Sequence, residues 1–163
     1  MALTEADTCR LHVTPALIAA GWDSHQQIVE QKYFTDGRVV LLGSKAKRNT
    51  GKKADYVLRY TRDVPVAIVE AKAFDHLAAE GLQQAMEYAE ILGVPFAYAT
   101  NGQEIIEHDY LTGVETTLTI FPSPDQLWSR WKSGKTLDGP AEEIVLTPGH
   151  QNPERIPRYY QTI

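Results

Sequence analysis

A glutamate and a lysine stand at the end of one strand-like run of this sequence, and their spacing suits catalytic chemistry. Residues 66–72 read VAIVEAK, and such a β-branched run predicts a buried strand. Side chains alternate between the two faces of a strand, so Glu70 and Lys72 share one face. Charges in this setting are costly unless they are paired or bind an ion. Taken alone, the pattern is more typical of a structural Glu–Lys ion pair.

Asp55 changes this interpretation, because a simple hairpin would bring it next to Glu70. Residues 55–60 predict a second strand, and a turn near residues 61–64 would connect the two strands. If the turn is centred between positions 62 and 63, Asp55 lies directly opposite Glu70, with Cβ atoms about 5 Å apart. Two carboxylates at this separation repel each other, so one stays neutral unless a cation lies between them.

Magnesium is the natural cation for such a pair, because it prefers hard oxygen ligands and keeps several of its waters. A bound magnesium ion polarises a phosphoryl oxygen and lowers the pKa of a bound water. Lys72, on the same side, could orient or activate that water, or stabilise the charge that develops on the phosphate. Asp55, Glu70 and Lys72 are therefore predicted to catalyse hydrolysis of a phosphodiester.

The pattern of Asp55 followed by Glu70-Ala71-Lys72 resembles the D…(D/E)xK signature of the restriction-endonuclease-like nuclease superfamily. The first motif there is often Pro-Asp, and here it is Ala54-Asp55, which keeps the acid. The resemblance implies Mg²⁺ as the cofactor, with Mn²⁺ as a substitute. It also implies the metal ligands, which are Asp55, Glu70 and the backbone carbonyl of Ala71.

A helix predicted over residues 77–92 strengthens this resemblance. Gln84 and Tyr88 are four residues apart and share one helical face. They match the QxxxY motif that follows the catalytic strand in one branch of these nucleases, which implies a supporting role or a contact with DNA. On their own they would be interpreted as a surface glutamine and a core aromatic residue. The family also has an acidic residue on its first helix; Glu5 matches that place, and Glu30 is a second candidate.

More widely, the sequence resembles the N-terminal nuclease domain of the restriction (R) subunit of type I restriction enzymes. The matching segments are ALIAAGW (16–22), KADYVLRY (53–60), PVAIVEAK (65–72), QQAMEYAEILGVPFAYATNG (83–102) and PRYYQ (157–161). The last segment matches the opening of the helicase motor, where the family glutamine, here Gln161, contacts the adenine of ATP. We therefore expect the chain to be part of a longer motor protein.

The resemblance implies a role for that longer protein. An R subunit translocates double-stranded DNA at the expense of ATP and cleaves it away from the recognition site, together with specificity and methylation subunits. ATP would thus act only through the motor domain. Two alternatives stay open: a stand-alone nuclease of the same superfamily, and a non-catalytic module that keeps the fold and binds DNA or the partner subunits.

Charge is distributed unevenly along the chain. The formal net charge is -5, which argues mildly against a protein whose whole surface binds nucleic acid. The segment 45–53 is nevertheless strongly basic and has no acidic residue; its cations are Lys45, Lys47, Arg48, Lys52 and Lys53. A phosphate backbone could dock on this segment, although a basic run alone is more typical of a solvated loop with its tip at residues 49–51.

The order of predicted elements gives the fold class. Helices are predicted over residues 4–20, 77–92 and 125–131, and strands over 27–34, 38–42, 55–60, 66–72, 95–100, 104–108 and 115–120. This order predicts an α/β (α+β) fold, with a restriction-endonuclease-like core in which helices flank a central mixed sheet. We expect a nuclease domain over residues 1–121. Residues 122–163 would form a short helix and a proline-rich linker to a helicase motor.

Composition excludes several other classes. No apolar run approaches the length of a membrane span, and the N-terminus lacks a basic-then-apolar signal pattern. A single cysteine, Cys9, cannot form an internal disulfide. We therefore expect a cytoplasmic protein with no membrane partner.

Overall fold

A mixed six-stranded sheet forms the centre of the computed structural model, which describes residues 3–34, 39–42, 45–48, 52–137 and 139–147. The strands run in the order β1-β4-β5-β6-β7-β8. Only β5 and β6 are parallel neighbours; the other adjacent pairs are antiparallel. The strands are β1 (Ile28–Phe34), β4 (Lys52–Thr61), β5 (Val64–Ala71), β6 (Phe96–Thr100), β7 (Ile105–Asp109) and β8 (Val114–Leu118). The predicted α+β class is confirmed.

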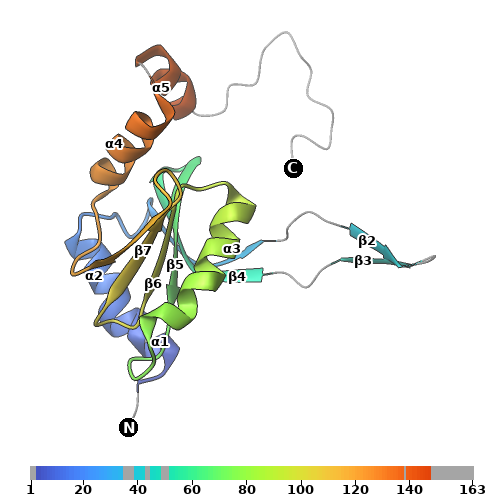
Figure 1. Cartoon of the computed structure of the whole chain (residues 1–163), viewed down its shortest axis with the longest axis vertical. Helices are drawn as coiled ribbons and strands as arrows, with labels where there is room; N and C mark the ends of the chain where they lie inside the picture. Colours follow the sequence, from blue (N-terminus) through green and yellow to red (C-terminus); the bar gives the residue numbers. More distant parts are fainter. Residues whose placement is uncertain (1–2, 35–38, 43–44, 49–51, 138, 148–163) are drawn as a thin grey trace.

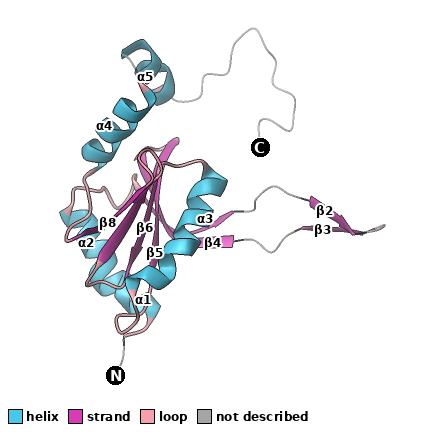
Figure 2. Ribbon diagram, in the orientation of Figure 1, coloured by secondary structure: helices cyan, strands magenta, loops and turns pink. Residues whose placement is uncertain are grey.

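Helices cover both faces of this sheet, as Figures 1 and 2 show. The N-terminal helical segment consists of α1 (Glu5–Thr8), a π-helical turn η1 (Cys9–Val13) and α2 (Thr14–Ala19). It packs on one face together with α4 (Pro124–Lys135). The opposite face is covered by α3 (Leu82–Leu92). The core therefore has two apolar layers, one on each side of the sheet.

The central strand β5 is the most deeply buried part of the fold. Its residues from Val66 to Val69 have no exposed surface, because α3 packs on one side and the N-terminal helical segment on the other. A strand buried on both faces requires a continuous apolar run rather than an alternating one. The sequence VAIV meets that requirement, so the charged residues that follow it stand at the edge of the core.

The N-terminal helix predicted over residues 4–20 is present, but its middle is a π-helical turn. Thr4 and Asp7 form a capping box at its start. Pro15 does not break the helix, because it lies in the first turn of α2, where its missing N–H and fixed φ angle are tolerated. Glu5, in the first turn of α1, thus begins a continuous helical segment.

The parallel pair β5–β6 is connected across the α3 face. The helix predicted over residues 77–92 begins as a 3₁₀ turn, η2 (Ala78–Gly81), and continues as α3. It ends at Gly93, whose φ of 67° suits a glycine at a helix C-cap. Antiparallel hairpins then add β7 and β8.

The basic segment is not the loop that we expected. Lys45–Arg48 form strand β3, which pairs with β2 (Val39–Leu42) in a separate two-stranded sheet. Lys52 and Lys53 already belong to β4. Backbone hydrogen bonds with a neighbouring strand form whatever the side-chain charge, so a basic run beside an apolar one can still pair. The expected loop tip, residues 49–51, lies outside the described residues.

The segment after β8 contains more helix than predicted. Instead of a short helix over 125–131, α4 spans twelve residues, with Ser123 as its N-cap and Pro124 in its first turn. Leu127 and Trp128 of α4 belong to the core. A second helix, α5 (Gly139–Leu146), was not predicted. Residues 148–163, which include Gln161, lie outside the described residues.

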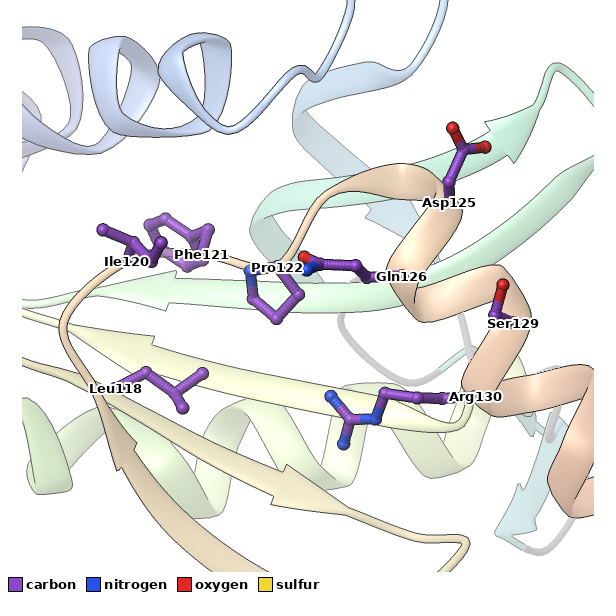
Figure 3. A pocket seen from close by; sticks show the side chains of 8 residues that line it. All are labelled: Leu118, Ile120, Phe121, Pro122, Asp125, Gln126, Ser129 and Arg130. Atoms are coloured by element: carbon purple, nitrogen blue, oxygen red, sulfur yellow. The ribbon is translucent and has the colours of Figure 1, made fainter.

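A cavity of about 570 Å³ lies between α4 and the end of β8. Figure 3 shows its lining, which includes Phe121, Gln126 and Arg130. Neither Asp55 nor Glu70 lines it, so this cavity is separate from the predicted site. None of the helices in the described ranges is long and apolar enough to cross a membrane.

Candidate active site

The β4–β5 hairpin has the register that the sequence predicted. Tyr56 pairs with Val69, and Leu58 pairs with Ala67. Extending this register by one residue places Asp55 opposite Glu70. A bulge at Arg59 shifts the pairing near the turn, but it does not reach the end of the hairpin where the two acids stand.

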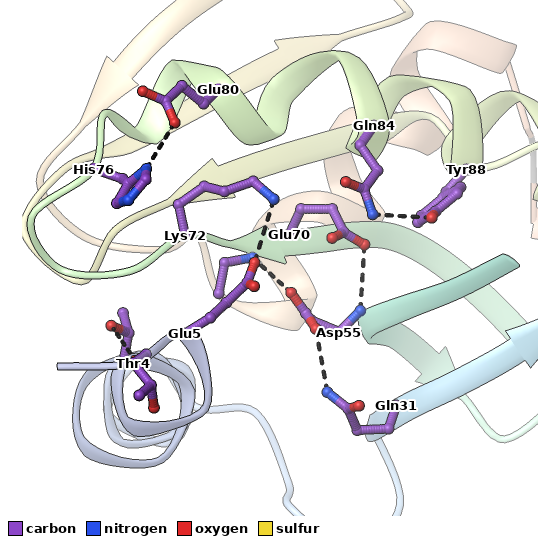
Figure 4. A network of polar contacts seen from close by, with 12 residues as sticks. Thr4, Glu5, Gln31, Asp55, Glu70, Lys72, His76, Glu80, Gln84 and Tyr88 are labelled. Carbon is purple, nitrogen blue, oxygen red and sulfur yellow. Dashed lines mark hydrogen bonds and ion pairs between the residues drawn. The ribbon is translucent and has the colours of Figure 1, made fainter.

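The Asp55 and Glu70 carboxylates each accept a hydrogen bond from a backbone amide across the hairpin (Figure 4). The Asp55 amide donates to Oε1 of Glu70 at 3.3 Å. The Ala71 amide donates to Oδ2 of Asp55 at 2.9 Å. Each carboxylate is therefore held by the strand that carries the other, which fixes their separation and makes the hairpin end a rigid acidic pair.

Glu70 has an unusual proton affinity for a carboxyl group. Its side chain is 2% exposed. Burial is the larger cause that raises the pKa of Glu70 to about 8, and the neighbouring Asp55 carboxylate is the second. Without a bound cation, Glu70 therefore holds a proton at neutral pH.

Lys72 follows β5 and lies near this pair, but its ammonium group contacts a third acid. Its Nζ is 3.2 Å from Oε1 of Glu5. The Lys72 amide donates to the Thr100 carbonyl at 2.8 Å, which holds the backbone against β6. Glu5, the acid that the resemblance places near the metal, is therefore connected to the site by its ion pair with Lys72.

The donors at this hairpin end fit a magnesium ion. Asp55 and Glu70 offer two carboxylates, and the backbone carbonyl of Ala71 is adjacent. Among the described residues, no group of three or more His, Cys, Asp or Glu side chains could hold a metal ion. Two carboxylates with the remaining positions left to water are what magnesium accepts. A proton retained by a buried acid beside a second acid is also a sign of a missing positive charge.

Gln84 and Tyr88 interact on α3 as their spacing predicted. Gln84 Nε2 donates to the Tyr88 hydroxyl at 2.9 Å. Tyr88 packs in the same apolar cluster as Ala54 and Ile68. Ala54 directly precedes Asp55, and Ile68 stands two residues before Glu70. Tyr88 therefore anchors the motif in the apolar layer that also carries the acidic pair, and its hydrogen bond with Gln84 is partly buried.

The other candidates are distributed around the hairpin. Glu30 is exposed on β1 and accepts a hydrogen bond from Thr14 at 3.3 Å, so the structure joins it to α2 and not to the acidic pair. Lys52 forms an ion pair with Glu87 at 3.2 Å. Lys53 lies over the Tyr33 ring, 5.3 Å from its centroid. Lys47 and Arg48 lie on β3, but their side chains are outside the described part of the structure.

One neighbour of Asp55 was missed by the sequence reasoning. Gln31 of β1 donates from Nε2 to Oδ1 of Asp55 at 3.2 Å. No local motif marks this glutamine, because its position depends on the pairing of β1 with β4, whose strands are distant in sequence. The sequence indicated only that Gln31 belongs to a strand predicted over residues 27–34.

A second recess, of about 410 Å³, opens beside the lysine. Glu5, Lys72, His76 and Glu80 are among the residues that line it. His76 Nδ1 is 3.0 Å from Glu80, and this contact raises the pKa of His76. The recess adjoins the acidic pair through Lys72, whereas Asp55 and Glu70 themselves are not among its lining residues.

The mixed sheet and the acidic hairpin end define the class of this protein: an α+β domain with a restriction-endonuclease-like core. A family model described as "Type I restriction enzyme R protein N terminus (HSDR_N)" matches residues 26–119. The chain belongs to this family.

Two relatives support the assignment. The chain is 41% identical over 170 residues to the "Type I restriction enzyme EcoAI endonuclease subunit" of Escherichia coli, an alignment covering 98% of this chain and 20% of that protein. A solved fragment assigned as an HsdR subunit of a type I restriction enzyme from Vibrio vulnificus YJ016 superposes with a TM-score of 0.82. It is 51% identical, over 99% of this chain and 31% of that one. The chain thus spans about a fifth of the curated relative.

Proposed function

We propose that this chain is the Mg²⁺-dependent endonuclease module of a type I restriction R subunit and that it hydrolyses phosphodiester bonds of double-stranded DNA. The observation that carries the proposal is the opposition of Asp55 and Glu70 at the end of the β4–β5 hairpin. Among the described residues no cation forms an ion pair with either acid, and Lys72, two residues after Glu70, lies close enough for its charge to act on Glu70.

Asp55, Glu70 and the carbonyl of Ala71 would hold the metal ion. When bound, Mg²⁺ supplies a polarised phosphoryl oxygen and a water of lowered pKa. Glu70 would first release the proton that its burial retains, because a metal ligand must be ionised. The amide of Ala71 keeps the Asp55 carboxylate in place during this change.

Lys72 would act on the substrate side of the site. Its ammonium group can leave the half-exposed carboxylate of Glu5 at modest cost, because exposed ion pairs contribute little. It would then orient the attacking water or stabilise the negative charge that develops on the scissile phosphate. The recess beside Lys72 gives the phosphate a place to lie.

The DNA backbone would contact the cations at the start of β4 and the basic hairpin. Lys52 and Lys53 precede Asp55 by three and two residues, so phosphates bound there would lie near the acidic pair. Lys47 and Arg48 of β3 would extend this contact. Gln84 and Tyr88 would support the site from α3. Such contacts position the duplex without reading its sequence.

In the whole R subunit, this module would act with an ATP-dependent DNA motor and with specificity and methylation subunits. The E. coli relative is an endonuclease subunit, and this chain corresponds to about one fifth of its length. ATP would act through the motor, with Gln161 at its entrance. The module itself would use only the metal ion.

Calorimetric titration of the chain with MnCl₂ and with MgCl₂ tests the proposal. We expect one metal site that is lost in Asp55→Ala. The matched control is Asp63→Ala, which removes an exposed aspartate from the turn of the same hairpin and should bind metal as the wild type does. Equal binding by the Asp55 and Asp63 variants would disprove the metal site.

Cleavage is tested in the longer, motor-containing protein. Glu70→Ala and Lys72→Ala should abolish double-strand cleavage while ATP-driven translocation continues. Full cleavage by the Glu70→Ala protein would refute the site assignment. Metal binding without cleavage in any context would favour the non-catalytic module.

A further inference from the structure

Gln31 has a backbone conformation that its place in a strand does not explain. Its φ angle is 53°, in the left-handed region that residues other than glycine, asparagine and aspartate seldom adopt. One other described non-glycine residue, Thr136, has a positive φ. Thr136 is the C-cap of α4, where a left-handed residue ends the helix. Gln31 has no such local reason.

The strand pairing on either side of Gln31 shows that its positive φ angle is not caused by a β-bulge, in which one strand has an extra residue. Glu30 pairs with Tyr56, and Lys32 pairs with Ala54, so the register is unchanged across Gln31. That register would place Gln31 opposite Asp55, yet the two are not paired in the ladder. The irregularity is therefore confined to the one residue of β1 that faces the candidate metal ligand.

The Gln31 side chain completes the set of donors around Asp55, as Figure 4 shows. Its Nε2 donates to Oδ1 at 3.2 Å, while the Ala71 amide donates to Oδ2 at 2.9 Å. Each oxygen of the Asp55 carboxylate thus has one neutral donor, one from β1 and one from β5. These two bonds set the rotation of the carboxylate plane.

We propose that Gln31 is a positioning residue for Asp55: its amide orients the carboxylate for metal binding, and its left-handed backbone is retained for that purpose. The inference rests on the proposed function. It assigns a role to a residue outside the nuclease signature, reached by strand pairing. Strain of this kind persists where the surrounding structure enforces it and is frequent at functional sites.

Two substitutions distinguish the effect of the Gln31 side-chain amide from the effect of its strained backbone. Gln31→Met keeps a side chain of similar length and removes the donor. Gln31→Gly removes the donor and also the steric cost of the positive φ angle. Lys32→Gly is the matched control, an exposed neighbour on the same strand without a positive φ angle, where glycine should only weaken the strand.

Each protein is titrated with MnCl₂ by calorimetry and melted without metal. We expect Gln31→Met to weaken manganese binding about tenfold, as loss of a residue that orients a metal ligand does, and to leave the melting temperature unchanged. Gln31→Gly should weaken binding to a similar extent and raise the melting temperature. Lys32→Gly should lower the melting temperature and bind manganese normally. A merely structural role would lower stability and binding together.

If Gln31→Met binds manganese as tightly as the wild type, Gln31 does not position Asp55. If Gln31→Gly melts at a lower temperature than the wild type, the backbone of Gln31 is not strained. The Asp55→Ala protein distinguishes these failures from failure of the proposed function. If manganese binds equally to wild type and Asp55→Ala, or to neither, the metal site is absent and the role of Gln31 is overturned with it.

Discussion

Two pairs of acidic residues lie on the same sheet, and they differ in the source of their counter-charge. One pair, Glu107 and Asp109, stands on β7 beneath α4. The other, Asp55 and Glu70, stands at the end of the β4–β5 hairpin. Both place two carboxylates close together on or near buried strands, where unpaired charge is costly.

The β7 pair is neutralised by the protein itself. Arg130 of α4 donates to Glu107 at 2.9 Å and to Asp109 at 2.7 Å. Hydrogen bonding to Glu107 is the main reason that the pKa of Arg130 is raised. The side chains of Glu107 and Asp109 are only 5% and 9% exposed. The cluster is complete without any ligand, and it fixes α4 on the sheet.

The hairpin pair is not neutralised in this way. Within the described residues, the groups that donate to Asp55 and Glu70 are amides. The ammonium group of Lys72 is bonded to Glu5. Burial first and the Asp55 carboxylate second raise the pKa of Glu70, and the nearby Lys72 charge offsets them only in part. A carboxylate pair that includes its own cation is a structural unit, whereas one without a cation is suited to bind one from solution.

Removal of Arg130 should have the largest effect on stability. Arg130→Met leaves two buried carboxylates without their cation, although Glu107 keeps the Tyr98 hydroxyl and Asp109 keeps the Leu111 amide as donors. We expect the free energy of unfolding to fall by roughly 3 kcal/mol. Urea denaturation monitored by tryptophan fluorescence measures this change. The control is Arg10→Met, whose side chain is 71% exposed beside Asp7; a change under about 0.5 kcal/mol is expected there. Similar small changes in both variants would show that the β7 cluster does not need its cation.

Glutamine in place of each buried glutamate should have opposite effects on the two pairs. The pKa of Glu70 is raised in the folded state from 4.5 to about 8. Between these pH values Glu70 is ionised in the unfolded chain but still protonated in the folded one. Glu70 therefore lowers the free energy of unfolding progressively as the pH rises, and it has no such effect below about pH 4.5. Glu70→Gln removes that cost and should stabilise the metal-free protein by up to roughly 4 kcal/mol at pH 8.

Glu107→Gln should instead destabilise the protein at pH 5 and pH 8, because Arg130 loses an ionised partner. Both variants are measured by urea denaturation with a chelator present. A loss of stability in Glu70→Gln at pH 8 would contradict the view that the hairpin pair lacks a cation.

The pH dependence of metal binding sharpens the same contrast. Metal binding at the hairpin must displace the proton of Glu70, so manganese affinity should rise about tenfold per pH unit from pH 6 to near 8 and then level off. Calorimetry in buffers of different ionisation enthalpy should show release of about one proton at pH 6.5. A pH-independent affinity over this range would mean that Glu70 is already ionised or is not a ligand.

The hairpin site could be predicted from sequence because its determinants are local. Alternation placed Glu70 and Lys72 on one face, and a two-residue turn fixed the register that brings Asp55 opposite Glu70. In a hairpin, the turn alone sets the register of both strands. The QxxxY pair was equally local, since Gln84 and Tyr88 lie on adjacent turns of one helix.

Contacts between distant segments could not be predicted in this way. Glu5 and Lys72 are 67 residues apart, and Gln31 and Asp55 are 24 apart. Neither distance is set by a turn or a helical repeat, because both depend on how whole elements pack. The same reason hid the role of Arg130, which lies in the helix predicted over residues 125–131 but was not expected to bind the sheet. The linker was predicted beyond that helix, yet α4 continues to Lys135 and α5 follows it.

The smallest effect is expected at Glu5, whose contact with Lys72 separates that cation from the hairpin pair. The Lys72 and Glu5 side chains are 21% and 49% exposed, so their ion pair contributes little. Glu5→Gln should change the free energy of unfolding by less than about 0.5 kcal/mol. The freed ammonium group of Lys72 can then turn toward Glu70, and since a nearby positive charge lowers the pKa of an acid, the pH at which manganese affinity levels off should fall.

Glu115→Gln is the matched control, because it removes an exposed charge of β8 that lies beside His108 of β7, and it should leave that pH unchanged. If Glu5→Gln were as destabilising as Arg130→Met, Lys72 and Glu5 would form a structural unit like the β7 cluster. The ammonium group would then be committed to the fold and unable to serve a phosphate. A small stability change combined with a lower pH midpoint would instead show that this cation, unlike Arg130, is held loosely enough to move between Glu5 and a substrate.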